Sequence, residues 1–292
     1  MDKRIIINAD DFGLCDTVNK AVAQAHTKGV LTSATIMANM PAAKDAIKIA
    51  KQLPALGVGV HLNLSMGQPL SNDICVKSLL NKNGNLGLLP ARLMIQSTLS
   101  HKFRTTIRTE LASQIQWVID NDIAPTHLDS HKHIHSFPAI FPIVCELARR
   151  FKIPAIRFSY EPKQILRLPW PLPSEGGRKR AGKIRAMAKI NRMQNADFLK
   201  TDALLGVAHL GKINVNFFRA VTLYTPVATA EVMTHPGLDN GTETDETRLL
   251  HQRKGELEAL CSERTKQYFE DTKIKLIHYG QLQQTEHKTP KK

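Results

Sequence analysis

The chain has 292 residues and a formal net charge of +14 at pH 7, from 40 lysines and arginines against 26 aspartates and glutamates. A hydrophobic fraction of 42% and a charged fraction of 23% are ordinary for a globular protein. There is no apolar run of about 18 residues, so the sequence predicts no bilayer-spanning helix. The apolar run Ile5–Ile7 is short and lacks a following cleavage site, so we expect a cytoplasmic protein.

Short β-like runs alternate with amphipathic helical stretches, which is the pattern of a parallel sheet or barrel. Predicted strands cover residues 4–9, 32–38, 57–64, 125–130, 155–158, 232–235 and 274–279. Predicted helices cover residues 17–28, 42–52, 105–121, 139–151, 214–221 and 246–263. Four widely spaced cysteines without a CxxC pair predict free thiols: Cys15, Cys75, Cys145 and Cys261.

Two stretches, residues 68–101 and 161–200, interrupt this alternation. Insertions of this size in α/β folds are often loops that cover an active site. Residues 178–192 carry seven lysines or arginines and no acid, interleaved with Ile184, Met187 and Ile190. This pattern fits either a solvated basic helix that caps the domain or a helix lying on an anionic membrane.

Two adjacent aspartates, Asp10 and Asp11, follow the apolar run near the N-terminus. Because side chains alternate along a strand, one carboxylate can hold a metal while its neighbour faces a substrate. Aspartate also favours helix N-caps, which is the structural alternative. In the strand predicted over residues 57–64, His61 and Asn63 share a face with two glycines, a poor core surface that suits a close-lying ligand.

The most specific signal is a cluster of four histidines within residues 126–135. Strand alternation groups His127, Asp129 and His131 on one side. Neutral imidazole is a common ligand for zinc and similar metals, and an adjacent aspartate can ligate the metal or orient a histidine. A hydrogen-bonded surface cluster is the alternative. Polar residues at the carboxyl ends of parallel strands are typical of α/β active sites.

His235 ends an apolar strand and precedes a Pro-Gly turn, so it is either a catalytic residue at the rim or a turn histidine. Together, the motifs supply one carboxylate and two imidazoles for a divalent cation. Asp10 remains as a base and His235 as an acid. A metal that activates water, a base and an acid for the departing amine are the parts that amide hydrolysis needs.

In these segments the chain resembles the YdjC-like carbohydrate deacetylases, a family that includes chitooligosaccharide deacetylases and the hopanoid-biosynthesis-associated HpnK proteins. The resemblance extends over residues 3–279. It rests on four motifs in a fixed order: NADDFG (8–13), HLNL (61–64), THLDSHKHIHSFP (126–138) and THPG (234–237).

The resemblance implies a single domain over residues 1–280, an irregular TIM-type (β/α) barrel of about seven strands with an inserted basic region at 161–200. Residues 281–292 are expected to form a flexible tail. The implied cofactor is one divalent metal, magnesium or zinc. The implied reaction removes an N-acetyl group from an amino sugar, either a chito-oligosaccharide or a lipid-linked sugar.

The resemblance also implies roles for individual residues. The metal ligands would be Asp11, His61 and His131. Asp10 would be the general base and His235 the acid. Four residues would contact substrate: His133, His135, Arg157 and Glu161. The choice between His131 and His133 stays open, because both would lie on one side of an extended strand. For Arg157 and Glu161, a surface ion pair is the alternative.

Other interpretations remain. Two histidines and a carboxylate also form the site of non-haem iron oxygenases, although those need no adjacent base. A sugar-binding protein without turnover is a further alternative. The positive charge suggests nucleic acid, but with 5% aromatic residues and no recognition motif we expect no specific nucleic-acid partner. The sequence is compatible with peripheral contact with an anionic membrane and with a homodimer.

Overall fold

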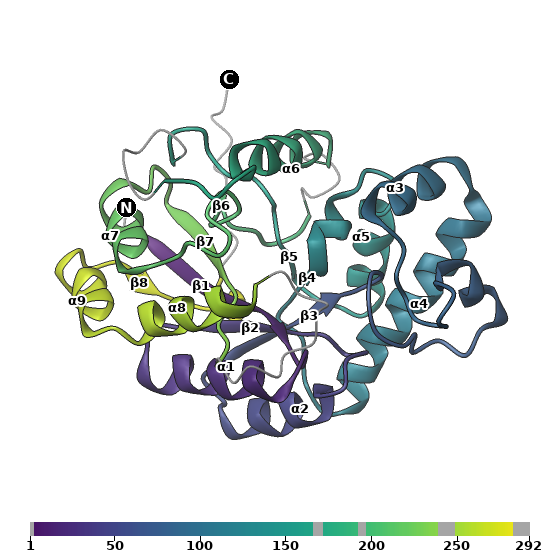
Figure 1. Cartoon of the computed structure of the whole chain (residues 1–292), viewed down its shortest axis with the longest axis horizontal. Coiled ribbons are helices and arrows are strands. Elements are labelled where there is room, and N and C mark those ends of the chain that lie inside the picture. The colour runs from purple at the N-terminus through teal and green to yellow at the C-terminus, as the bar shows by residue number, and fades with distance from the viewer. Residues whose placement is uncertain (1–2, 166–171, 192–196, 239–248, 283–292) are drawn as a thin grey trace, which may run out of the picture.

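The computed structural model describes residues 3–165, 172–191, 197–238 and 249–282. Its centre is a curled sheet of parallel strands in the order β5-β4-β3-β2-β1-β7-β6, with β8 also paired to β1 (Figure 1). The strands are β1 (Arg4–Phe12), β2 (Ser33–Ile36), β3 (Gly57–Leu62), β4 (His127–Ser130), β5 (Ala155–Ile156), β6 (Ala203–Leu205), β7 (Thr229–Thr234) and β8 (Lys275–Leu276).

Helices surround the outside of this sheet (Figure 1). They are α1 (Asp16–Lys28), α2 (Ala43–Gln52), α3 (Pro90–Leu99), α4 (His101–Asp120), α5 (Phe141–Arg150), α6 (Gly177–Asn191), α7 (Val215–Tyr224), α8 (Leu250–Cys261) and α9 (Glu263–Asp271). The described residues also include the 3-10 turns η1 (Ile74–Leu79), η2 (His131–Ser136) and η4 (Tyr279–Gln281). None of these helices is long and apolar enough to cross a membrane.

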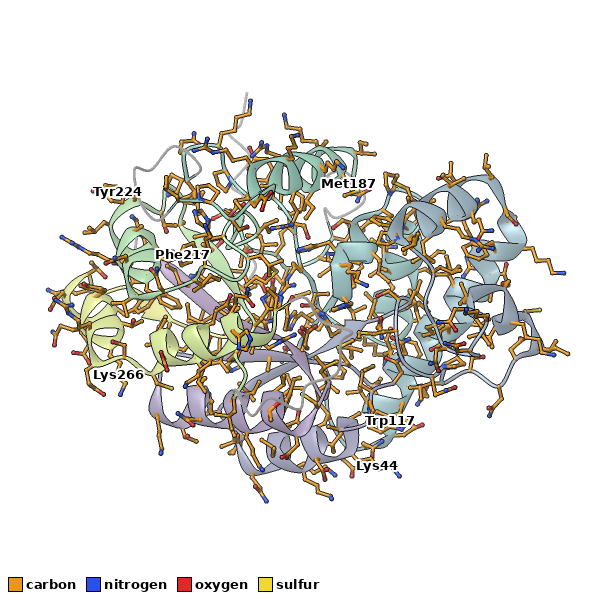
Figure 2. The ribbon with its side chains drawn as sticks, in the orientation of Figure 1. Lys44, Trp117, Met187, Phe217, Tyr224 and Lys266 are labelled. Carbon is orange, nitrogen blue, oxygen red and sulfur yellow. The ribbon has the colours of Figure 1, made fainter. Side chains whose placement is uncertain are left out.

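Strand β1 is buried on both faces beyond Arg4, which explains the uninterrupted apolar run Ile5–Ile7. Ile5 and Ile7 belong to the main core, which also contains Phe217 of α7 (labelled in Figure 2). Ile6 faces the other way, in a small cluster with Ala155, Tyr279 and Leu282. Because side chains alternate, Asp10 lies on the same inner face as Ile6, further along the strand.

The predicted α/β barrel-like fold is confirmed, with corrections at individual elements. All seven predicted strands form, but β6 was not predicted, since three residues show no periodicity. No pairing joins β5 to β6 among the described residues, so the sheet is curled rather than fully closed. The prediction of one helix over 246–263 is wrong at its end, because the helix stops at Cys261 and α9 follows; residues 246–248 lie outside the described ranges.

The basic segment forms helix α6, which packs on the domain through part of its apolar side chains. Ile184 is buried with Ala181 and Ala188 against a cluster that includes β6, and Met187 (labelled in Figure 2) packs against that cluster. Ile184 and Met187 therefore face the domain, whereas Ile190, the third apolar residue of the segment, is 63% exposed. The exposed side carries Arg178, Lys179, Lys183 and Lys189 together with Ile190, so the packing fits a basic helix that caps the domain, and contact with a membrane stays a prediction.

Two smaller predictions can also be compared with the structure. The four cysteines form no disulfide, as predicted. The tail was predicted to begin at residue 281, but Leu282 is buried in the inner cluster, so the packed chain extends at least that far. The remainder of the predicted tail, residues 283–292, lies outside the described residues.

Candidate active site

The carboxyl ends of β1, β3, β4 and β7 bring the sequence motifs together inside the curled sheet. At the end of β1, Asp11 has a left-handed φ of 65°, and the register with β2 is irregular between Ala9 and Phe12. Regular alternation would turn two successive carboxylates to opposite faces. This local break instead lets both Asp10 and Asp11 approach His61. The two aspartates nevertheless have different partners, since Asp10 is held by Arg157 and Asp11 by His131 and Arg253.

Three groups from different strands form the candidate metal site. The Asp11 Oδ1 atom lies 2.9 Å from His131 Nδ1 and 3.3 Å from His61 Nε2. All three ligand atoms lie within 4.8 Å of one another. One carboxylate oxygen and two imidazole nitrogens at this spacing suit a divalent cation with open coordination positions.

His61 is oriented through its other ring nitrogen. The Nδ1 atom lies 2.7 Å from Asp129 Oδ1, and the Thr35 hydroxyl donates to Asp129 Oδ2 at 3.1 Å. Burial opposes protonation of His61, but the Asp129 and Asp10 carboxylates raise its pKa to about 10. The same carboxylates would attract a metal cation. This carboxylate–histidine arrangement is common at metal sites, so these residues fit a divalent metal.

The backbone distinguishes His131 from His133. Strand β4 ends at Ser130, and the chain then enters η2, where Lys132 and His133 have left-handed φ values of 54° and 53°. The expectation of a continued extended strand is wrong. Because of this turn, His131 contacts Asp11, whereas His133 Nδ1 lies 3.4 Å from the Ser159 hydroxyl.

Asp10 is held by a buried arginine. The Arg157 Nη1 and Nη2 atoms donate to the two Asp10 oxygens at 2.8 and 2.6 Å. The same guanidinium lies 2.6 Å from Glu231 Oε1 and 2.9 Å from Asp129 Oδ2. Burial alone would raise the pKa of Asp10, but the charge and hydrogen bonds of Arg157 outweigh it and hold that pKa below its ordinary value. Tyr279 donates to the second oxygen of Glu231.

His235 lies at the end of β7 on the other side of Asp10. Its Nε2 atom is 4.0 Å from Asp10 Oδ2, and its backbone N–H donates to Glu256 of α8 at 2.6 Å. Burial lowers the pKa of His235 to about 4, although Asp10 and Asp11 oppose that shift. The imidazole is therefore neutral near pH 7. Glu256 also accepts the Gly211 N–H, so it fixes the backbone that carries His235.

A second buried arginine, Arg253 of α8, holds the other oxygen of Asp11. Its Nη2 atom donates to Asp11 Oδ2 at 2.6 Å, while its Nε and Nη1 atoms have no hydrogen-bond partner among the described residues. This contact fixes the orientation of the Asp11 carboxylate. Sequence reasoning missed Arg253, Glu256 and Glu231. Of these three, only Glu231 could have been recognised, because it is a charged residue inside a buried strand.

The residues predicted to contact substrate lie in different surroundings. Both ring nitrogens of His135 contact serine hydroxyls, those of Ser130 and Ser159. The Glu161 carboxylate accepts backbone N–H groups of Gly206 and Ala208, each at 2.9 Å. Arg157 and Glu161 are both 1% exposed, and the structure shows no ion pair between them. The alternative of a surface ion pair is therefore wrong.

Comparisons with known proteins show the family of this chain. A sequence model of the family described as YdjC-like protein matches residues 4–271. A protein named carbohydrate deacetylase from Brevibacillus brevis is 33% identical over 281 residues, which are 96% of this chain and 99% of the relative. A protein named chitooligosaccharide deacetylase from Salmonella paratyphi B is 42% identical over 149 residues, 51% of this chain and 56% of the relative.

The fold is also found among solved structures. A protein of Enterococcus faecalis, described as a candidate for cellobiose-phosphate cleavage, superimposes with a TM-score of 0.76 at 22% identity and covers 96% of this chain and 98% of its own. At that identity the likeness establishes the fold alone. Family match, relatives and fold agree with the four ordered sequence motifs, and the chain belongs to the YdjC-like protein family.

Proposed function

We propose that this protein is a metal-dependent deacetylase that removes the N-acetyl group of an amino sugar. One observation carries the proposal: Asp11, His61 and His131 converge within 4.8 Å, with Asp10 and His235 beside them. Relatives named carbohydrate deacetylase and chitooligosaccharide deacetylase support the choice of substrate class. The iron-oxygenase and non-catalytic alternatives gain no support from these relatives.

Asp11, His61 and His131 would hold the cation, which can be magnesium or zinc. When bound, a divalent cation polarises an amide carbonyl and makes a water molecule more acidic. Asp129 and Arg253 would fix the directions of His61 and Asp11. Such supporting contacts keep metal ligands in the orientation that binding requires.

Asp10 and His235 would move the protons of the reaction. Asp10 accepts a proton from the attacking water, and His235 donates one to the amine nitrogen as it leaves, because an unprotonated amine is a poor leaving group. Since burial keeps His235 neutral, it must first gain a proton. Asp10 lies 4.0 Å away and would be the source, so the proton removed from water reaches the amine.

We assign Arg157 and Glu161 to positioning and not to direct contact with substrate hydroxyls. The guanidinium of Arg157 already contacts three carboxylates. Glu161 accepts two backbone N–H groups next to β6. His133, which is 9% exposed, is better placed than His135 to line the substrate site.

Acetate release from N-acetylglucosamine oligomers, with added divalent metals and a chelator control, tests the proposal. Asp10→Asn and His61→Ala should each abolish release. Asp16→Asn and His101→Ala, which change an exposed aspartate and an exposed histidine, should leave it unchanged. Metal-independent release, or full activity of the His61→Ala variant, would refute the proposed chemistry.

A further inference from the structure

The segment that interrupts the fold between β3 and β4 exposes an apolar surface. Of the nine large apolar side chains that are exposed in the described structure, five lie within residues 74–99. On α3 they follow helical spacing: Ala91, Met94, Ile95, Thr98 and Leu99 occupy one face. Ile95 is 55% exposed and Leu99 81%. An exposed apolar helical stripe of this kind commonly marks an interaction site.

Basic residues accompany this stripe. Residues 74–109 contain no aspartate or glutamate and six lysines or arginines: Lys77, Lys82, Arg92, Lys102, Arg104 and Arg108. Arg92 and Lys102 are exposed. Arg104 Nη1 donates to the carbonyls of Ser97 and Thr98 at 2.8 and 3.2 Å, which places the basic start of α4 against the end of α3.

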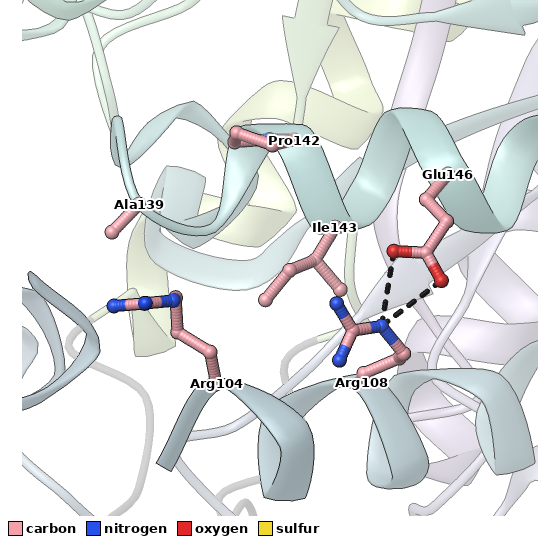
Figure 3. Close-up of a pocket in the computed structure, with 6 residues that line it drawn as sticks. All are labelled: Arg104, Arg108, Ala139, Pro142, Ile143 and Glu146. Carbon is pink, nitrogen blue, oxygen red and sulfur yellow. Dashed lines mark hydrogen bonds and ion pairs between the residues drawn. The ribbon is translucent and has the colours of Figure 1, made fainter. Parts of the chain in front are cut away.

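A pocket of about 270 Å³ opens beside this junction, between α4 and α5 (Figure 3). Arg108 donates to both oxygens of Glu146 at 3.0 Å, so its charge is largely matched. Arg104 extends toward Ala139, apart from that pair (Figure 3), and forms no ion pair among the described residues. The charge of Arg104, whose Nη1 donates to two backbone carbonyls, is therefore not matched by a carboxylate among the described residues.

We propose that the α3 surface, consisting of Met94, Ile95, Leu99 and the cations Arg92, Lys102 and Arg104, binds an anionic membrane. The apolar side chains enter the boundary of the acyl chains, while the cations meet lipid phosphates. Amphipathic helices that lie in the membrane interface combine these two features. On α6, by contrast, Ile184 is directed into the core.

A second copy of this chain is a less suitable occupant. A two-fold dimer brings the same patch of each subunit together. Such a contact would bring the cations of one copy near those of the other, and residues 74–109 contain no acid to neutralise them. An anionic lipid surface supplies the missing opposite charge.

The α3 surface is joined to the active site through α4. Gln114 of α4 donates to the Asn63 carbonyl at 2.7 Å and accepts the Asn63 N–H at 2.9 Å, two residues beyond His61. Ten helical residues from Arg104 to Gln114 span about 15 Å. A membrane-bound enzyme would thus hold its site close to the bilayer, where an amphiphilic amino sugar is found. That consequence for the substrate rests on the proposed deacetylase function.

Co-sedimentation of the full chain with vesicles tests the proposal. Vesicles of phosphatidylcholine with about one quarter phosphatidylglycerol should bind the wild type, and pure phosphatidylcholine should bind it weakly. Ile95→Asp/Leu99→Asp should lower the binding constant about tenfold or more. Leu223→Asp, which introduces one such aspartate at an exposed leucine of α7, should not alter it.

Two double variants that remove the same charge distinguish binding through the α3 surface from attraction by the overall net charge of +14. Arg92→Gln/Lys102→Gln should weaken binding about 25-fold, since each cation near the surface contributes a factor of about five. Lys179→Gln/Lys183→Gln removes the same charge from α6 and should have a much smaller effect. Equal losses in the two pairs, or a wild-type dimer that the α3 aspartates convert to monomer, would overturn the proposal. Turnover of soluble oligosaccharide should be unchanged in every variant, which separates this test from that of the deacetylase function.

Discussion

Replacing Arg157 by methionine should destabilise the protein strongly, and by an amount that depends on pH. The side chain is 0% exposed and contacts Asp10, Asp129 and Glu231 at 2.6 to 2.9 Å. Methionine preserves apolar volume but leaves three buried acidic groups without their cation. Breaking a buried ion pair from one side costs about 3–5 kcal/mol. For a chain of this length, that loss lowers Tm on the order of 10 °C.

The pH dependence has a definite sign. In the wild type, Arg157 holds the pKa of Asp10 below its ordinary value of 3.8. A depressed pKa stabilises the fold above the unfolded-state pKa, and this contribution is lost as the pH falls. Without the guanidinium, burial raises the pKa of the orphaned carboxylates, so the difference between wild type and Arg157→Met should be largest above that raised pKa and should shrink as the pH falls through it and the carboxylates become protonated.

Urea denaturation at a series of pH values measures this difference. Arg149→Met, at an exposed arginine paired with Asp197, is the matched control and should change stability by less than about 0.5 kcal/mol. Adding Glu231→Gln to Arg157→Met should recover part of the loss at neutral pH, because one buried charge is removed. A loss that stays constant from pH 3 to pH 7, or no recovery in the double variant, would refute the electrostatic reasoning.

Three further predictions concern single residues. Asp129→Asn should weaken metal binding about 10- to 100-fold in calorimetry, because the charge that orients His61 is lost; an unchanged affinity would contradict this role. Gly59→Ala should lower the free energy of unfolding by about 1–3 kcal/mol in urea denaturation, because the added Cβ would lie 2.5 Å from the buried ring of His127. The control Gly182→Ala adds a Cβ that meets no atom within 4 Å, so it should be neutral or stabilising. Burial raises the pKa of Glu161 to about 7, so protonation of Glu161 favours the folded state, and this contribution to stability is lost as the pH rises from about 4.5 to 7. The slope of unfolding free energy against pH should therefore be shallower in Glu161→Ala. An equal slope would show that Glu161 does not titrate in this range.

Most of the sheet could be predicted from local pattern. The apolar run before Asp10 and the alternation around His61 predict strands, because buried strands are continuously apolar or alternate between apolar and polar residues. Strand β6 and helices α3 and α9 escaped prediction. Strand β6 has three residues, and α3 carries its apolar side chains on an exposed face, so neither shows the expected contrast between buried and exposed sides.

The sequence by itself determined which residue types meet at the site, because the ends of parallel strands converge whatever the details of packing. Only the tertiary structure decided how they are arranged. The left-handed φ of Asp11 and the end of β4 at Ser130 direct Asp11 and His131 toward each other. A change in one backbone dihedral angle leaves no trace in the hydrophobic periodicity, so the sequence pattern does not predict it. Arg157, Arg253 and Glu256 take their partners from residues more than 20 positions away in the chain, and such pairings depend on how distant elements pack.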